Sequence, residues 1–127
     1  MAEAPVRLLL VDDEVGFLDV LKKRLSKRGF AVVPASSGAE AIRVLRDRDF
    51  DVAVLDLKLG DMDGIEVLDV FKKMVPGLPV IMLTGHGSEQ AAREGMAKGA
   101  HDYLLKPCDL DDLLAKVREA VGREEAS

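Results

Sequence analysis

The stretch Asp51-Val-Ala-Val-Leu-Asp56 decides the fold, because its apolar residues run unbroken from 52 to 55 and end at a carboxylate. A short, uninterrupted apolar run is typical of a strand that is covered on both faces, as in parallel sheets. Similar runs lie on either side of it along the chain. The other four segments that we expect to be strands are Val6–Val11, Ala31–Val33, Pro79–Leu83 and Tyr103–Leu105.

Apolar residues at helical spacing fill the intervals between these runs. Gly29 is expected to end the first helix, as glycine often does at a C-terminal cap. The residues expected to face the sheet are Phe17, Leu18, Leu21 and Leu25; Ala41, Ile42 and Leu45; Ile65, Leu68, Phe71 and Val75; Ala91, Ala92 and Gly95 within 88–98; and Leu110, Leu113, Leu114, Val117 and Val121. Five such units predict an α/β fold with an open parallel sheet and helices on both faces. A barrel of eight units needs about 250 residues and is excluded.

The length of 127 residues favours one domain over 1–127, with a core from about 6 to 121. Apolar residues make up 48% of the chain and charged residues 32%, which is enough for an apolar core and a charged surface in contact with water. The formal charge of −5 argues against binding nucleic acid through clustered positive charge. A chain with nothing downstream is expected to act through its own surface, unless it is a fragment of a longer regulator.

No feature of the sequence indicates secretion or a membrane. Cys108 is the only cysteine, so no disulfide can form within the chain. Residues 1–5 lack the charged and apolar regions of a secretion signal. The longest apolar runs, Leu8–Val11 and Pro79–Leu83, are far shorter than the roughly 20 residues of a membrane span. We therefore expect a cytoplasmic protein without a membrane partner.

Polar residues follow the expected strands where the carboxyl ends of a parallel sheet meet. Asp12-Asp13 follows the first strand, Asp56 ends the third, Thr84-Gly85 follows the fourth and Lys106-Pro107 follows the fifth. Ligands of open α/β sheets bind at this edge. Three carboxylates together call for a compensating cation, and Mg²⁺ prefers oxygen ligands.

Together these four motifs closely resemble the receiver domain of bacterial two-component response regulators, over about Val6 to Val121. Each motif is weak alone, but their joint placement along five β/α units is specific. The resemblance implies a flavodoxin-like (βα)5 sandwich with strand order 2-1-3-4-5. It also implies a switch in two-component signal transduction that is not a turnover enzyme.

The resemblance implies that Asp56 accepts a phosphoryl group from a histidine kinase or a phosphotransfer protein. Asp13 and Asp56 would hold Mg²⁺, or Mn²⁺, directly. Asp12 would act directly or through water, and the backbone carbonyl of Lys58 would add a ligand. The metal would offset charge between the carboxylates and the phosphoryl group.

The same resemblance assigns roles to residues after the fourth and fifth strands. Lys106 would pair with one phosphoryl oxygen, and Thr84 would hydrogen-bond another. The Lys106–Pro107 peptide would be cis and would aim the lysine. Tyr103 would turn inward as Thr84 moves, and this would change the surface formed by the helix within 88–98, the fifth strand and the last helix. That surface would bind a downstream protein or a second copy of the chain.

Two positions near the site vary in the family, and one departs from its pattern. Lys58 and His86 are hypothesised to tune autodephosphorylation, by affecting how water reaches the phosphoryl group. Gly60 stands where family members commonly have proline, so the loop is expected to be looser. Asp61 is interpreted as a solvated loop acid rather than a residue that alters metal affinity.

Simpler interpretations stay open for single residues. The three aspartates could be solvated acids that cap helices, Thr84 a loop residue and Lys106 a surface lysine. Tyr103 could be a half-buried strand aromatic.

Two other functions share parts of this pattern. A phosphatase of the haloacid dehalogenase type also uses an aspartate nucleophile, but it needs a different acidic spacing after the first strand. A flavodoxin-like nucleotide carrier needs a glycine-rich phosphate loop, which is absent there.

Overall fold

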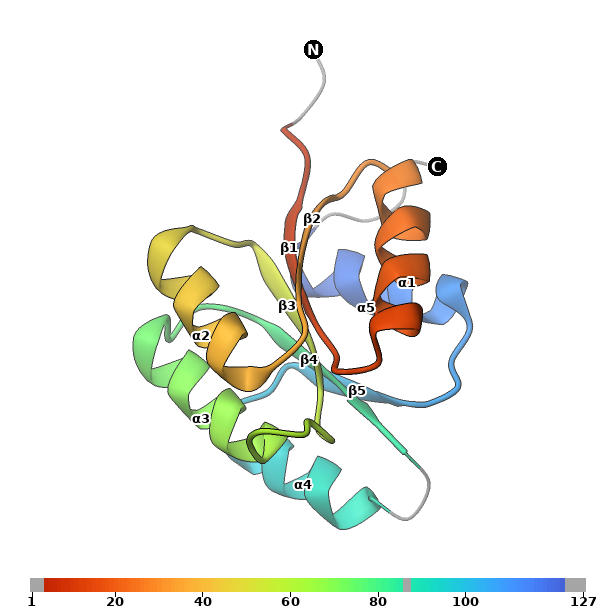
Figure 1. The fold of residues 1–127 in the computed structure, drawn as a ribbon. Coiled ribbons are helices and arrows are strands. Elements are labelled where there is room, and N and C mark those ends of the chain that lie inside the picture. The colour runs from red at the N-terminus through yellow and green to blue at the C-terminus, as the bar shows by residue number, and fades with distance from the viewer. Residues whose placement is uncertain (1–3, 86–87, 123–127) are drawn as a thin grey trace.

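A computed structural model describes residues 4–85 and 88–122, and its centre is a five-stranded sheet in which every pairing is parallel. The strand order is β2-β1-β3-β4-β5, which confirms the predicted fold class (Figure 1). The strands are β1 (Arg7–Val11), β2 (Ala31–Ala35), β3 (Val52–Asp56), β4 (Val80–Thr84) and β5 (Asp102–Leu105).

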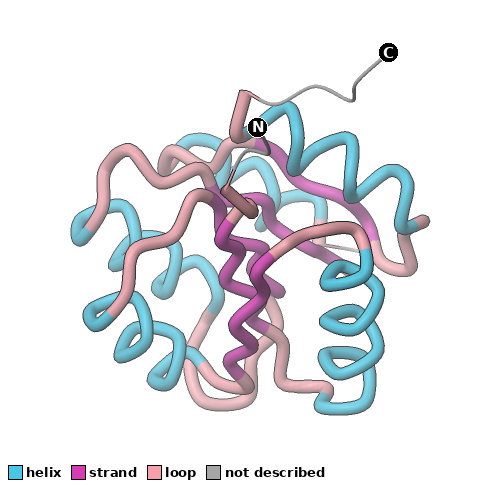
Figure 2. The backbone as a smooth tube through the Cα atoms, turned by 90° about the horizontal axis from the view of Figure 1, so that it is seen from above, coloured by secondary structure: helices cyan, strands magenta, loops and turns pink. Residues whose placement is uncertain are grey.

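Helices cover both faces of this sheet. In Figure 1 α1 and α5 lie on one side and α2, α3 and α4 on the other, and Figure 2 shows the strands running between the two layers. The helices are α1 (Val15–Lys27), α2 (Gly38–Asp47), α3 (Gly64–Met74), α4 (Glu89–Ala97) and α5 (Leu110–Ala120). None of the described helices is long and apolar enough to cross a membrane.

Alternation along the strands divides the interior into two cores, because successive side chains point to opposite faces. The core under α2, α3 and α4 includes Leu9, Val11, Ala53, Leu55 and Met82. The core under α1 and α5 includes Leu8, Leu10, Val52, Val54 and Ile81. Since β1, β3 and β4 are buried on both faces, their sequences show continuous apolar runs rather than alternation.

The strand boundaries match the sequence prediction to within one residue, except at the end of β2. Strand β2 continues past Val33 to Ala35 and includes Pro34, which pairs with Leu10 in the register. Proline is tolerated there because β2 lies at the edge of the sheet. Helix α2 begins at Gly38, three residues before the first of its predicted apolar residues, and Ser37 caps it by accepting a hydrogen bond from the backbone N–H of Glu40.

Gly64 allows the loop after β3 to pack tightly against the start of α3. Its backbone N–H donates to the carbonyl of Leu57, and a Cβ at this position would lie 2.3 Å from Leu57 Cα. Backbone cannot move away as a flexible side chain can, so Gly64→Ala is expected to lower the free energy of unfolding by about 2 kcal/mol.

The matched control for this prediction is Gly16→Ala, since nothing lies within 4 Å of a Cβ on Gly16 in α1. That change should stabilise the helix by about 0.5 to 1 kcal/mol. Urea unfolding followed by circular dichroism measures both variants. Equal stability of the Gly64→Ala protein and the parent would contradict the packing argument.

Candidate functional site

The carboxyl ends of four strands bring together the polar residues that the sequence singled out. Asp12 follows β1, Asp56 ends β3, Thr84 ends β4 and Lys106 follows β5. Asp12, Asp56 and Thr84 are buried, at 0%, 5% and 1% exposure, although all three are polar. Buried polar side chains are costly unless they are paired, so their clustering marks this edge as the candidate site.

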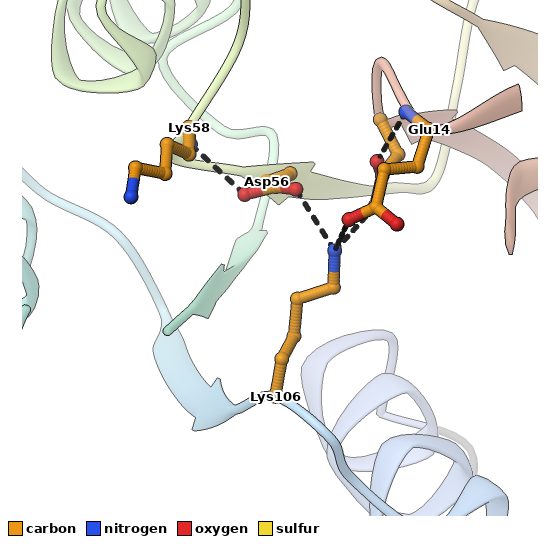
Figure 3. A network of polar contacts seen from close by, with 5 residues as sticks. Glu14, Asp56, Lys58 and Lys106 are labelled. Carbon is orange, nitrogen blue, oxygen red and sulfur yellow. Dashed lines mark hydrogen bonds and ion pairs between the residues drawn. The ribbon is translucent and has the colours of Figure 1, made fainter. Parts of the chain in front are cut away.

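Lys106 joins the acidic residues of the site (Figure 3). Its Nζ atom donates to Asp12 Oδ2 at 2.8 Å and to Asp56 Oδ2 at 2.9 Å. Glu14 Oε1 lies 3.7 Å from the same nitrogen. The lysine therefore connects carboxylates that follow two different strands, 94 and 50 residues away from it in the chain.

Burial and pairing act in opposite directions on these groups. Burial by itself lowers the pKa of Lys106, but its hydrogen bonds to Asp12 and Asp56 outweigh burial, and the pKa is raised. Burial raises the pKa of Asp12, and the hydrogen bond from Lys106 only partly offsets it. Lys106 is therefore firmly protonated, whereas Asp12 is held in an unfavourable place for a negative charge.

The carboxylates of Asp12, Asp13 and Asp56 could together hold a metal ion. Each offers an oxygen, and these atoms all lie within 4.8 Å of one another. Asp13 is exposed, so the cluster opens to solvent. Hard divalent cations such as Mg²⁺ prefer such oxygen ligands, and one lysine does not neutralise three carboxylates. The donor set therefore fits Mg²⁺.

Thr84 supplies an unsatisfied polar atom at the same edge. Its Oγ1 is buried, and it has no hydrogen-bond partner within the described part of the chain. A buried hydroxyl without a partner costs free energy and needs an explanation. A ligand with acceptor atoms at this edge would provide the missing partner.

Lys58 contacts the carboxylate of Asp56 through its backbone rather than its side chain. Its backbone N–H donates to Asp56 Oδ1 at 2.9 Å, and its side chain points away from the carboxylate in Figure 3. Lys58 also forms an isolated antiparallel bridge with Asp63. These contacts hold the loop after β3 next to the candidate site.

Asp61 is an exposed loop acid, in line with its interpretation, and it also contacts the start of α2. Its carboxylate accepts hydrogen bonds from the backbone N–H groups of Gly38 at 2.9 Å and Ala39 at 3.0 Å, at the start of α2. These two bonds lower the pKa of Asp61, as expected at the positive end of a helix. The loop that contains Gly60 is thus anchored to α2, so the missing proline does not leave it unattached.

The structure also describes most of the remaining predicted residues. Tyr103 is 36% exposed on β5 and faces outward rather than into the protein. Gly85 is exposed, with open space where a Cβ would lie. The Lys106–Pro107 peptide bond is cis. His86 lies outside the described residues.

The sequence did not identify two neighbours of Lys106. Glu14 approaches its ammonium, and the ring of Phe17 lies under it, with the nitrogen 4.4 Å from the ring centroid. The position of Glu14 directly after Asp13 was an available signal. Phe17 offers no such signal, because its spacing marks it only as part of the apolar face of a helix.

Comparison with known proteins identifies the family. Residues 8–118 match the family model described as response regulator receiver domain. The chain is 41% identical over 121 residues to the transcriptional regulatory protein GlrR of Escherichia coli K12, covering 95% of this chain and 27% of that protein. It is 38% identical over 131 residues to the alginate biosynthesis transcriptional regulatory protein AlgB of Pseudomonas aeruginosa, covering 98% of this chain and 29% of that protein.

Solved structures agree with this match. A response regulator receiver domain protein from Clostridium thermocellum superposes with a TM-score of 0.89 at 34% identity, covering 92% of this chain and 94% of that one. The receiver domain of NtrX from Brucella abortus superposes with a TM-score of 0.87 at 34% identity, covering 92% of this chain and 99% of that one. The chain thus spans under a third of the curated relatives named above but nearly all of these isolated domains. The fold, the residues at the carboxyl edge of the sheet and the comparisons all agree. The chain belongs to the response regulator receiver domain family.

Proposed function

We propose that this receiver domain is a phosphorylation-controlled switch whose phosphoacceptor is Asp56. The observation that carries the proposal is the pairing of Lys106 with both Asp12 and Asp56, beside the unpartnered hydroxyl of Thr84. A carboxylate nucleophile next to a fixed ammonium suits transfer of an anionic group. The family match does not support the phosphatase or nucleotide-carrier alternatives.

The proposed reaction is a displacement at phosphorus. A carboxylate oxygen of Asp56 forms a bond to phosphorus while the bond from phosphorus to a histidine nitrogen of the kinase or phosphotransfer protein breaks. The electron pair of that bond stays on the imidazole, and an aspartyl phosphate results. Lys106 then pairs with one phosphoryl oxygen, and Thr84 Oγ1 donates to another, which would satisfy its hydroxyl.

Asp12, Asp13 and Asp56, with the backbone carbonyl of Lys58, would hold Mg²⁺ or Mn²⁺. When bound, the ion supplies positive charge that offsets repulsion between the carboxylates and the phosphoryl group. Around it, Asp56 provides the attacking oxygen and Lys106 stays protonated, since its pKa is raised by its acidic partners.

The proposed output is a change in the surface made by α4, β5 and α5. Thr84 ends β4 and Tyr103 lies on the adjacent β5, so movement of the first can be passed to the second. Tyr103 and Leu105 are both exposed on β5, where they could contact a downstream protein or a second copy of the chain. The names of the relatives as transcriptional regulatory proteins support control of transcription as the final effect.

Incubation with Mg²⁺ and acetyl phosphate tests the proposal. Mass spectrometry of the intact protein should show one added phosphoryl group, with the label on Asp56 after peptide mapping. Asp56→Asn should remove the label completely, whereas Asp69→Asn should retain it, because Asp69 pairs with Lys73 on α3.

An unlabelled parent protein would overturn the proposal, and multiple turnovers on a phosphomonoester would favour the phosphatase instead. The decay of the label also tests Lys58 and His86. We propose that exchanging both side chains changes the phosphoryl lifetime, and an unchanged lifetime would refute their tuning role.

A further inference from the structure

Phe17 lies directly against the ammonium of Lys106, at 4.4 Å from nitrogen to ring centroid. We propose that Phe17 is a positioning residue for phosphoryl transfer, which holds Lys106 in place by a cation–π contact. The inference rests on the proposed function, because it concerns transfer to Asp56. Nothing in the resemblance or in the comparisons assigns Phe17 a role.

The ring is itself partly buried against the core. Phe17 lies in the first turn of α1, directly after the loop that contains Asp12 and Asp13, and it packs against the core beneath α1 and α5. Phe17 also lines a groove of about 100 Å³ together with Val20, Leu21, Arg24, Cys108, Leu110 and Leu113. The ring therefore contacts both the core and the ammonium of Lys106.

The contact differs in kind from the other contacts of Lys106. Asp12 and Asp56 hold the ammonium now, but both are also candidate metal ligands, and Asp56 is the proposed acceptor. When these carboxylates take on those roles, their hold on the lysine weakens. The aromatic face is uncharged and binds neither metal nor phosphoryl group, so its attraction for the ammonium persists.

A lysine has four rotatable side-chain bonds, and freezing them costs entropy. Lys106 is still partly exposed, with 18% of its side chain accessible. A ring that keeps the ammonium near Asp56 reduces the side-chain entropy that Lys106 must lose during transfer. Loss of this contact should therefore slow phosphorylation without changing which residue accepts the group.

The test compares Phe17→Leu, which stays apolar but lacks a π face, with Phe17→Tyr and Phe17→Trp, which retain one. Phosphorylation by acetyl phosphate at saturating Mg²⁺ should be about threefold to tenfold slower in Phe17→Leu and close to the parent rate in the two aromatic variants. Val20→Ala is the matched control, since Val20 lines the same groove. It should leave the rate unchanged.

A nuclear magnetic resonance measurement separates positioning from a general structural effect. The side-chain methylene protons of Lys106 should show upfield ring-current shifts in the parent, Phe17→Tyr and Val20→Ala proteins. These shifts should disappear in Phe17→Leu.

Equal phosphorylation rates for Phe17→Leu and the parent would overturn the inference, as would an equally slow Phe17→Tyr protein. Failure of the proposed function gives a different result, because the parent protein would not be labelled at all. In that case the methylene shifts decide alone: their loss in Phe17→Leu supports the contact with Lys106, and their persistence refutes it.

Discussion

Lys106→Met is expected to slow phosphorylation of Asp56 by acetyl phosphate about tenfold to a hundredfold, the range for a lost hydrogen bond to a charged group. It should also lower the free energy of unfolding by about 3 kcal/mol without metal, because Asp12 is fully buried and loses its cationic partner. Methionine keeps most of the apolar stem of lysine, so the effect comes mainly from the charge.

The loss of stability should depend on pH in a defined direction. The folded pKa of Lys106 is raised, so its stabilisation is fully present below the ordinary lysine pKa of about 10.4 and is lost only as pH rises through the folded value. The folded pKa of Asp12 is also raised, and losing Lys106 should raise it further. The difference between parent and variant should thus be largest near neutral pH and should shrink as acid protonates Asp12.

Urea unfolding at several pH values and a time course of phosphorylation measure the two effects. Lys23→Met is the matched control, because Lys23 pairs with Asp19 on the exposed face of α1. Exposed pairs contribute little, so this variant should be close to the parent in both assays. A Lys106→Met protein with the parent's rate would exclude Lys106 from the reaction.

The sequence predicts the fold well because two physical signals agree in each unit. The unbroken apolar run of β3 reflects a strand buried on both faces, and the helical spacing of the next segment reflects one buried face. The predicted length of strand β2 is too short because proline usually ends a strand. Pro34 is tolerated only because β2 lies at the edge of the sheet.

The predicted strand ends also indicated where the candidate site lies. The carboxyl ends of parallel strands meet at one edge of the sheet, whatever the conformation of the loops. Contacts that depend on side-chain direction were not accessible in this way. Asp61 reaches the start of α2, more than twenty residues earlier, and Phe17 reaches Lys106 across the sheet edge. Neither contact follows from periodicity, because each depends on how two separate elements pack.

Mg²⁺ is expected to stabilise the folded protein, and Asp13→Asn is expected to remove most of that effect. A ligand that binds only the folded state adds about 1.4 kcal/mol at ten times its dissociation constant and about 2.7 kcal/mol at one hundred times. Asp13 is the exposed member of the acidic cluster, and no contact to Lys106 compensates its charge in the structure described.

The same variant should be more stable than the parent without metal, because one of three carboxylates within 4.8 Å loses its charge. Thermal unfolding with increasing MgCl₂, at constant ionic strength set by KCl, separates binding from screening. Asp19→Asn should retain the full metal response, since Asp19 pairs with Lys23 away from the cluster. If Asp13→Asn were stabilised by Mg²⁺ as strongly as the parent, the ion would bind elsewhere, and the acidic cluster would need another explanation for its buried charge.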